Sequence, residues 1–206
     1  YIANPNQPSG NIINRKTLHR VIKKAESKKK YIVIDEAYID FSNQKSCSNL
    51  ISSYKNLIII KTFSKSIGIA GLRMGYIICH PKISKVIKSV RPVFDISHFT
   101  LKVAEYFLLN NKIFKKHMKA IKKSKQFVKE ECLKRNLKLL NTETNFFHIF
   151  PKKKKINKIF NFLKSKKILV KAKYSKGFKV LNNSLRVTYG SKRQMKYFFK
   201  QFDRIY

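Results

Sequence analysis

The spacing of apolar residues in the first half of the chain predicts alternating helices and strands. Leu18, Val21 and Ile22 recur at helical spacing within residues 13–29, which indicates an amphipathic helix. Three short apolar runs are typical of strands buried in a parallel sheet: YIVID at 31–35, LIIIK at 57–61 and GYIIC at 75–79. Strands separated by helical or loop crossovers predict an α/β layered domain.

A different pattern begins near residue 98 and predicts a second, smaller α+β unit. Helices are expected at 98–110, at 112–135, around 156–163 and after Ser191, which would cap the last one. Short strands are expected at 137–140, 145–150, 168–170 and 185–189. The predicted division places residues 1–108 in the first unit and residues 109–206 in the second.

The formal net charge of +37 allows two interpretations. A basic surface gains affinity for nucleic acid by releasing phosphate counterions, but a lysine-rich surface can also be an ordinary solvated one. The second interpretation is favoured, because only eight of the 47 basic residues are Arg and the lysines spread over the whole length. No helix-turn-helix, zinc-finger or RNA-binding motif accompanies them. A basic nucleic-acid-binding protein therefore stays as an alternative, and no specific nucleic-acid partner is expected.

Other features of the composition favour the cytoplasm. No apolar stretch reaches the length that spans a bilayer, and no basic-then-apolar leader opens the sequence. Cys47, Cys79 and Cys132 are odd in number and lack CxxC spacing. This usage is typical of reduced thiols rather than of a disulfide framework or a zinc site. We expect a cytoplasmic globular protein with neither a bound metal nor a membrane partner.

Candidate chemistry follows the predicted strands directly. Asp35, Glu36 and Asp40 cluster after the first strand, although the chain has only ten acidic residues. Residues 62–65 follow the second strand and His80 follows the third. Because ligands of open α/β sheets bind at the carboxyl ends of the strands, these positions are the first candidates for a site.

Lys65 differs from the other lysines in its surroundings. It lies in a loop of small residues, TFSKSIGIAGLRMGY at 62–76, directly after a strand. Burial and nearby positive charge would lower the pKa of its amine and make it a nucleophile at neutral pH. Ser64, the loop amides and Arg73 would together suit a bound phosphate dianion.

Three segments carry a family resemblance: NPNQPSG at 4–10, YIVIDEAYIDF at 31–41 and TFSKSIGIAGLRMGY at 62–76. In this order and spacing they resemble the central motifs of class I/II aminotransferases of pyridoxal-phosphate fold type I, closest to the histidinol-phosphate aminotransferase subfamily. SLRVTYG at 184–190 is the best anchor of the resemblance in the second half. The resemblance implies an α/β fold, with 1–108 as the C-terminal part of the large cofactor-binding domain and 109–206 as the small C-terminal domain.

The resemblance also implies roles at the cofactor, pyridoxal 5′-phosphate. Lys65 would hold the cofactor as a Schiff base and carry the proton between the substrate α-carbon and the cofactor. Asp35 would keep the ring nitrogen protonated so that the ring acts as an electron sink, and Tyr38 would donate to the ring oxygen. The residues implied to bind the cofactor phosphate are Ser64, Arg73 and, as a further candidate, Thr62.

Five more residues are implied by the same resemblance. Arg186 would grip the substrate carboxylate as a two-pronged pair. Asn145 would face the substrate, with a strand-edge cap as the alternative interpretation. Lys171 stands near the place where the subfamily tends to have a second arginine. At the ring oxygen Gln7 replaces the usual Asn and is one methylene longer, so Asn6 is an alternative donor.

The implied reaction moves an amino group between an amino acid or amino-alcohol phosphate and a 2-oxo acid such as 2-oxoglutarate, in a homodimer. A decarboxylase of the same fold, of the threonine-phosphate type, is the alternative within the same chemistry. The sequence enters the first motif directly after Tyr1. We therefore expect an N-terminally truncated fragment that forms part of the pocket and, by itself, binds the cofactor weakly at best.

Overall fold

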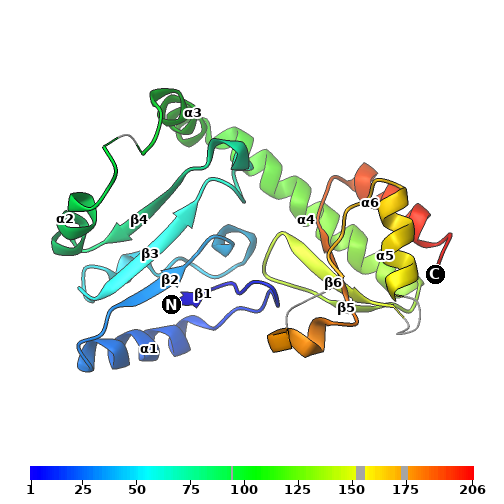
Figure 1. Cartoon of the computed structure of the whole chain (residues 1–206), viewed down its shortest axis with the longest axis horizontal. Coiled ribbons are helices and arrows are strands. Elements are labelled where there is room, and N and C mark those ends of the chain that lie inside the picture. The colour runs from blue at the N-terminus through cyan, green and yellow to red at the C-terminus, as the bar shows by residue number, and fades with distance from the viewer. Residues whose placement is uncertain (94, 152–155, 173–175) are drawn as a thin grey trace. The chain divides into compact units, whose positions relative to one another are not determined.

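The computed structural model describes residues 1–93, 95–151, 156–172 and 176–206, and it comprises two compact units, Tyr1–Lys115 and Lys116–Tyr206 (Figure 1). The α-helices are α1 (Arg15–Ser27), α2 (Pro81–Ser89), α3 (His98–Leu109), α4 (Asn111–Lys134), α5 (Ile156–Ser165) and α6 (Lys192–Phe202). The strands are β1 (Ile2–Ala3), β2 (Ile32–Asp35), β3 (Leu57–Thr62), β4 (Gly75–Cys79), β5 (Lys138–Leu140), β6 (Phe146–Phe150) and β7 (Leu185–Thr188). The 3-10 helices are η1 (Ile39–Phe41), η2 (Ser48–Leu50), η3 (Ala70–Leu72) and η5 (Lys176–Leu181). The division between the units falls within α4, whereas the boundary expected from the sequence falls at the end of α3.

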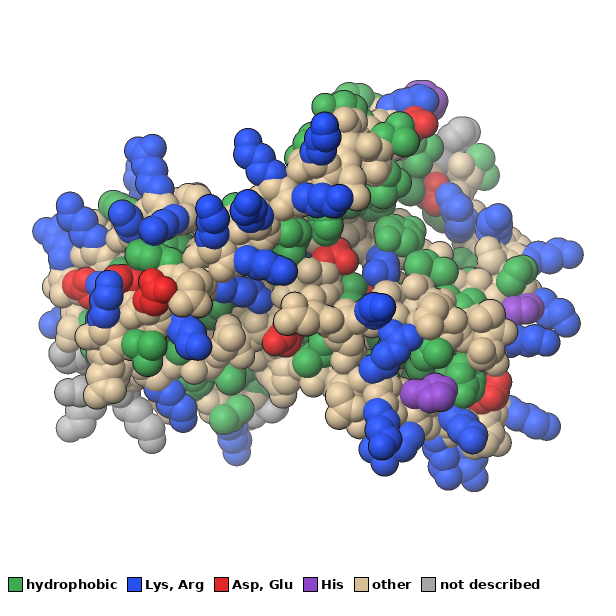
Figure 2. All heavy atoms as spheres, turned by 180° about the vertical axis from the view of Figure 1, so that it is seen from behind, with side chains coloured by type: hydrophobic (Ala, Val, Ile, Leu, Met, Phe, Trp, Pro, Cys, Tyr) green, Lys and Arg blue, Asp and Glu red, His purple; other side chains and the backbone are tan. Residues whose placement is uncertain are grey.

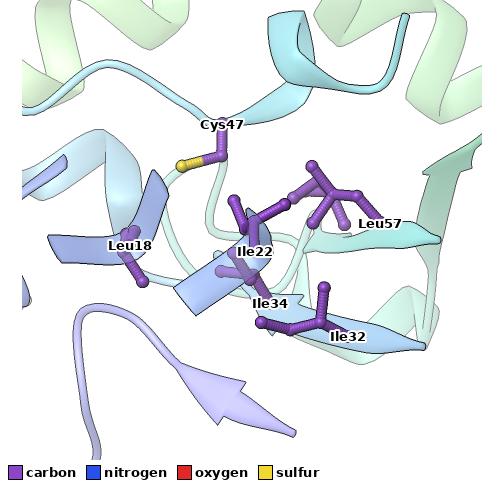
Figure 3. Close-up of a cluster of buried hydrophobic side chains, with 7 residues drawn as sticks. Leu18, Ile22, Ile32, Ile34, Cys47 and Leu57 are labelled. Atoms are coloured by element: carbon purple, nitrogen blue, oxygen red, sulfur yellow. The ribbon is translucent and has the colours of Figure 1, made fainter. Parts of the chain in front are cut away.

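The first unit is built on a four-stranded sheet in the order β1-β2-β3-β4. Strands β1, β2 and β3 are parallel, and their register aligns Asp35 with Ala3 on one side and with Ile60 on the other. Helix α1 covers one face of this sheet (Figure 1). The buried cluster between them consists of Leu18, Ile22, Ile32, Ile34, Cys47, Leu57 and Ile59 (Figure 3). Since side chains alternate along a strand, Ile32 and Ile34 of β2 and Leu57 and Ile59 of β3 enter this cluster.

Local sequence signals explain where the helices begin. The Asn14 side chain accepts a hydrogen bond from the Thr17 amide at 2.9 Å and so caps α1. At α6 the Ser191 and Gln194 side chains cap each other's backbone amides, which is the reciprocal capping box. The helices predicted at 13–29, 98–110, 112–135, around 156–163 and after Ser191 are confirmed as α1, α3, α4, α5 and α6.

Strand β4 differs from its prediction. It pairs antiparallel with β3 and forms an edge of the sheet, and Tyr76 and Ile77 are 44% and 46% exposed. The prediction of a buried parallel strand was wrong because residues 63–74 contain just the short η3 and reverse the chain direction, whereas a parallel neighbour needs a crossover connection. His80 consequently lies at the opposite end of the sheet from Asp35. It caps α2, a helix that the pattern analysis did not predict, by accepting a hydrogen bond from the Lys82 amide at 3.3 Å.

The second unit contains an antiparallel sheet in the order β5-β6-β7, with α5, α6 and the C-terminal part of α4. Its largest fully buried side chains are Phe147, Ile149, Ile159, Leu163, Phe198, Phe199 and Phe202. The strand predicted at 168–170 is absent. The chain leaves α5 through Lys167 in the left-handed region (φ 59°), and the Ile168 amide bonds back to the Leu163 carbonyl at 2.9 Å. The only β-type pairing described for this segment is an isolated antiparallel bridge between Lys171 and Arg186.

Candidate active site

The carboxyl ends of β1, β2 and β3 meet at one edge of the first unit's sheet. The Asn4 amide donates to the Asp35 carbonyl and the Glu36 amide donates to the Ile60 carbonyl, both at 2.9 Å. These bonds bring the ends of the three strands side by side. The three motifs at 4–10, 31–41 and 62–76 therefore share the edge at which open α/β sheets bind their ligands.

Asp35 is half-buried and its carboxylate is held as a hydrogen-bond acceptor. Oδ1 accepts from the Ala37 amide at 2.9 Å, and Oδ2 accepts from the Tyr1 hydroxyl. The bond to Asp35, assisted by burial, raises the pKa of Tyr1 to about 12. A protonated ring nitrogen is a donor of the same kind as this hydroxyl, so the carboxylate fits the role that the family resemblance implies.

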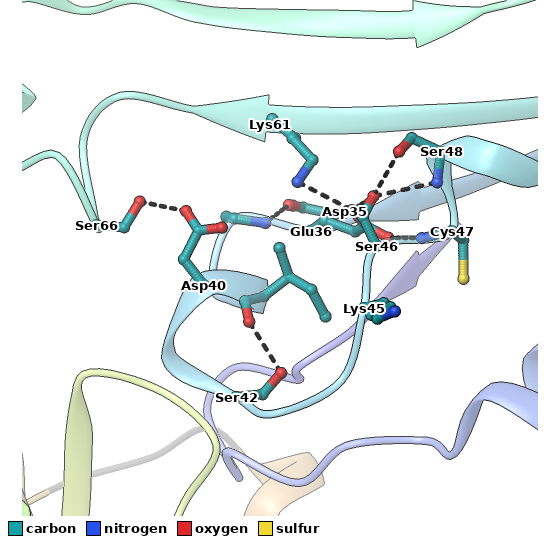
Figure 4. A network of polar contacts seen from close by, with 12 residues as sticks. Asp35, Glu36, Asp40, Ser42, Lys45, Ser46, Cys47, Ser48, Lys61 and Ser66 are labelled. Carbon is teal, nitrogen blue, oxygen red and sulfur yellow. Dashed lines mark hydrogen bonds and ion pairs between the residues drawn. The ribbon is translucent and has the colours of Figure 1, made fainter. Parts of the chain in front are cut away.

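Glu36 makes a different set of contacts, with the segment that leads into η2. Its carboxylate is buried and accepts from the Cys47 amide at 2.7 Å and from Ser46 Oγ at 2.5 Å. Lys61 Nζ forms an ion pair with it at 3.3 Å (Figure 4). Burial raises the pKa of the Cys47 thiol, and the Glu36 charge adds to this effect. Glu36 is therefore a fully partnered structural residue, although the sequence groups it with Asp35.

Lys65 lies beside Tyr38. Its Nζ is 5.3 Å from the centroid of the Tyr38 ring, which is buried. The neighbouring Ser66, also buried, donates to the Asp40 carboxylate and ties the Lys65 loop to the segment after β2 (Figure 4). Lys65 itself is half-buried, less than the sequence led us to expect. Among the residues that the structure describes, no carboxylate forms a salt bridge with its amine.

The loop after β3 closes on itself. The Phe63 amide donates to the Met74 carbonyl at 3.1 Å, so their chain neighbours Ser64 and Arg73 both lie at the neck of this loop. Thr62 Oγ1 accepts from the Ser64 amide at 3.1 Å and shapes the turn that leads to Lys65. Arg73 adopts a left-handed backbone conformation (φ 53°) and is exposed, with Nη1 donating to the Ala70 carbonyl at 3.1 Å.

The motif at 4–10 is organised by a residue that the sequence analysis missed. Asn4 is buried, and its amide group bonds to both the amide and the carbonyl of Ile13, at 2.7 and 3.3 Å. The oxygen of the Asn6 side chain accepts from Ser9 Oγ at 2.7 Å, and Gln7 is exposed. An Asn directly before a proline is a turn signal in the sequence, and it could have pointed to Asn4. Its burial and its hydrogen bonds are visible only in the structure.

Three predicted substrate residues belong to the second unit. Arg186 and Lys171 exchange both backbone hydrogen bonds, at 2.8 and 3.0 Å, so that their side chains project from the same face of the sheet. The Arg186 guanidinium lies 5.0 Å from the centroid of the Phe146 ring. Asn145 directly precedes β6, and its carbonyl accepts from the Tyr189 amide at 2.8 Å.

The first unit also has a hollow of about 990 Å³ over β4 and α3, and this hollow contains none of the predicted site residues. Its lining is mostly apolar, including Met74, Leu101 and Leu108, and two of its charged residues, Arg91 and Asp95, pair with each other. A catalytic site needs convergent polar groups. The Lys65 neighbourhood brings the motif residues together, whereas the hollow is lined mostly by apolar side chains, so we place the candidate site at Lys65.

Metal-binding clusters and membrane-spanning helices are both absent from the described ranges. No group of three or more His, Cys, Asp or Glu residues there could hold a metal ion. Nor does any helix in those ranges have the length and apolar character needed to cross a membrane. The three cysteines are free thiols.

Comparison with known proteins identifies the family. The family model described as aminotransferase class I and II matches residues 1–202, and the chain belongs to this family. Histidinol-phosphate aminotransferase of Buchnera aphidicola subsp. Cinara cedri is 36% identical over 196 residues, which are 93% of this chain and 54% of that protein. The enzyme of the same name from Thermotoga neapolitana is 29% identical over 203 residues, covering 98% of this chain and 57% of that protein. The chain thus spans about half the length of the curated relatives it matches.

Solved structures show the same fold. The histidinol-phosphate aminotransferase of Clostridium acetobutylicum superposes with a TM-score of 0.88 at 26% identity, over 98% of this chain and 61% of that one. The Sinorhizobium meliloti enzyme, solved in complex with pyridoxal-5′-phosphate, gives 0.85 at 23% identity, over 100% of this chain and 56% of that one. The α/β fold expected from the motifs, that of fold type I aminotransferases, is confirmed.

Proposed function

We propose that this chain carries the catalytic lysine of a pyridoxal-phosphate-dependent aminotransferase of the histidinol-phosphate type. The observation behind this proposal is the position of the Lys65 amine. It lies beside the buried Tyr38 ring, next to the carboxyl ends of the parallel strands and without a salt bridge among the described residues. A lysine so placed is available for covalent bonding to an aldehyde. The membership of the chain in the aminotransferase class I and II family supports the same reaction.

The chain's own residues fit the cofactor. When bound, pyridoxal phosphate supplies an electron sink for the carbanion at the substrate α-carbon. Asp35, which accepts hydrogen bonds at both carboxylate oxygens, would hold a proton on the ring nitrogen. Tyr38 would donate to the ring oxygen, and Lys65 would move a proton to and from the substrate α-carbon. The residues proposed to hold the phosphate at the neck of the loop are Ser64, Arg73 and Thr62.

The proposed substrates are anionic. Arg186 and Lys171 place two cations on one face of the second unit's sheet, which suits a carboxylate and a phosphate. The relatives named above are histidinol-phosphate aminotransferases. We accordingly propose a phosphate-bearing amino compound of the histidinol-phosphate kind as donor and a 2-oxo acid such as 2-oxoglutarate as acceptor. The curated relatives named above are aminotransferases, which favours transamination over the decarboxylase alternative.

The assignment of the two units is part of this proposal. The first unit, with the motifs and Lys65, would belong to the large cofactor-binding domain, and the second unit would be the small C-terminal domain. We propose a cytoplasmic homodimer as the working form.

Replacement of Lys65 by alanine tests the function in the complete gene product. The Lys65→Ala protein should give no borohydride-reducible cofactor adduct and no transamination, whereas Lys55→Ala, at an exposed position, should retain both. Asp35→Asn should keep the adduct but lose at least about a hundredfold in rate, since a neutral amide does not hold the ring nitrogen protonated. Mass spectrometry of the reduced protein locates the adduct. An adduct on a different lysine, or normal turnover of Lys65→Ala, would refute the proposal.

A further inference from the structure

Lys125 of α4 is a half-buried lysine whose amine has defined partners. Nζ donates to the Thr142 carbonyl at 3.1 Å and lies 5.6 Å from the centroid of the Tyr189 ring. Burial is the main cause of a lowered pKa for Lys125; nearby Lys122 lowers it further and Glu143 opposes the shift. Lysine side chains usually keep the ammonium group in water. Its position against a carbonyl and an aromatic face therefore indicates a specific task.

Tyr189, the aromatic partner of Lys125, holds the turn formed by residues 141–145. Its backbone amide donates to the Asn145 carbonyl at 2.8 Å, and its hydroxyl donates to Asn141 Oδ1 at 3.4 Å. The ring is buried and packs on Phe147 with the centroids 4.8 Å apart. Burial also raises the pKa of the Tyr189 hydroxyl, which therefore stays protonated as a donor. Tyr189 thus contacts both ends of the turn.

The turn itself is a closed hydrogen-bonded unit. The Thr142 and Thr144 hydroxyls are buried and 2.7 Å apart, and the Thr142 hydroxyl also donates to the Phe146 carbonyl. The residue before Lys125 on α4 secures the neighbouring segment, since Ser124 Oγ donates to the Gly190 carbonyl at 2.7 Å. Two consecutive side chains of α4 therefore hold the segments beside Asn145 and Arg186, two of the proposed substrate residues.

We infer that Lys125 is a positioning residue, which ties the turn 141–145 to Tyr189. It thereby sets the place of Asn145, which precedes β6, and of Arg186 in β7, the strand that Tyr189 directly follows. This inference rests on the proposed aminotransferase function. Since Asn145 and Arg186 are proposed to bind the substrate, a shift in the position of either side chain should weaken substrate binding. The residues proposed to bind the cofactor all belong to the first unit, whereas Lys125 and its partners Thr142 and Tyr189 belong to the second. Loss of Lys125 should therefore weaken substrate binding and leave cofactor binding intact.

Kinetics of two substitutions at this position in the complete, cofactor-loaded gene product test the inference. In Lys125→Met the KM for histidinol phosphate should rise about tenfold, because the turn that positions Asn145 loses its hydrogen bond from a charged donor. Its kcat should stay within about twofold, and the borohydride-reducible adduct at Lys65 should be unchanged. Lys125→Arg should return the KM close to the wild-type value. The control is Lys129→Met, at an exposed position one turn along the same helix, and its KM should equal that of the wild type. An unaltered KM in Lys125→Met, or loss of the adduct, would overturn the inference.

Amide hydrogen exchange gives a readout that does not depend on catalysis. The Tyr189 amide, which bonds to the Asn145 carbonyl, should exchange about tenfold faster in Lys125→Met than in Lys129→Met. Equal exchange in the two variants would show that Lys125 does not hold the turn. If the wild-type protein lacked transaminase activity, the proposed function would fail, and the exchange measurement would still decide whether Lys125 orders this segment.

Discussion

Asp35 and Glu36 are neighbours in the chain, yet the fold gives them different tasks. Because successive side chains leave an extended chain on opposite sides, the two carboxylates reach different partners. Asp35 accepts from the Tyr1 hydroxyl and the Ala37 amide, whereas Glu36 is buried against the segment before η2 and pairs with Lys61. The Asp35 carboxylate is suited to binding a ligand, and the Glu36 carboxylate is suited to stabilising the fold.

Substitution of Glu36 should show its structural role. Glu36→Gln leaves the largely buried Lys61 ammonium without its counter-charge, so the free energy of unfolding should fall by about 2–3 kcal/mol. The matched control is Glu105→Gln, whose salt bridge with Lys102 is exposed at both ends and should contribute less than about 1 kcal/mol. The chain has no tryptophan, so urea unfolding is best followed by circular dichroism. Equal losses in the two variants would contradict this role for Glu36.

At the scale of elements, the antiparallel pair of β3 and β4 supports the lysine loop. Thr62 and Gly75 are opposite each other in the register, and the loop between them carries Lys65 and Arg73. A Cβ atom at Gly75 would lie 2.7 Å from the Lys61 carbonyl oxygen, a backbone atom that cannot move without shifting β3. The close approach of the two strands therefore requires glycine at this place.

An alanine at Gly75 tests this requirement. Gly75→Ala should lower the free energy of unfolding by about 1–3 kcal/mol, because the strands must separate to admit the methyl group. Gly71→Ala in the same loop is the control, since a Cβ there meets nothing within 4 Å, and its effect should stay within about 0.5 kcal/mol. Thermal or urea unfolding of both variants provides the comparison. A harmless Gly75→Ala would mean that β3 and β4 are farther apart than described.

At the scale of the whole molecule, the dominant property is positive charge. Figure 2 shows lysine and arginine side chains spread over the face that it draws, with acidic side chains scattered between them. A net charge of +37 attracts any polyanion. Specific reading of bases needs side chains placed in a groove, often arginines, and dispersed lysines do not supply this.

Binding to DNA should consequently be weak and independent of sequence. Affinity for two unrelated duplexes of about 20 base pairs should be equal within error and fall at least about a hundredfold between 50 and 200 mM salt, through counterion release. Fluorescence anisotropy at several salt concentrations measures both properties. Tight binding to one duplex at the higher salt concentration would favour the nucleic-acid interpretation instead.

Much of this protein could be predicted from its sequence because the signals are local. Helical spacing defined α1, helical spacing with the cap at Ser191 defined α6, and short apolar runs defined β2 and β3. The motif around Lys65 identified the candidate lysine, since a loop of small residues after a buried strand is visible in the chain itself. Family membership followed from the same segments.

Other properties depended on contacts between residues far apart in the chain, which no local pattern contains. The direction of β4 depends on the path of the whole loop after β3, so GYIIC could be taken for a parallel strand although it pairs antiparallel. The separate tasks of Asp35 and Glu36 emerged only when Cys47 and Lys61 were seen against Glu36. Lys125 resembles the other lysines of α4 in sequence, and only the folded second unit places it against the Thr142 carbonyl and the Tyr189 ring.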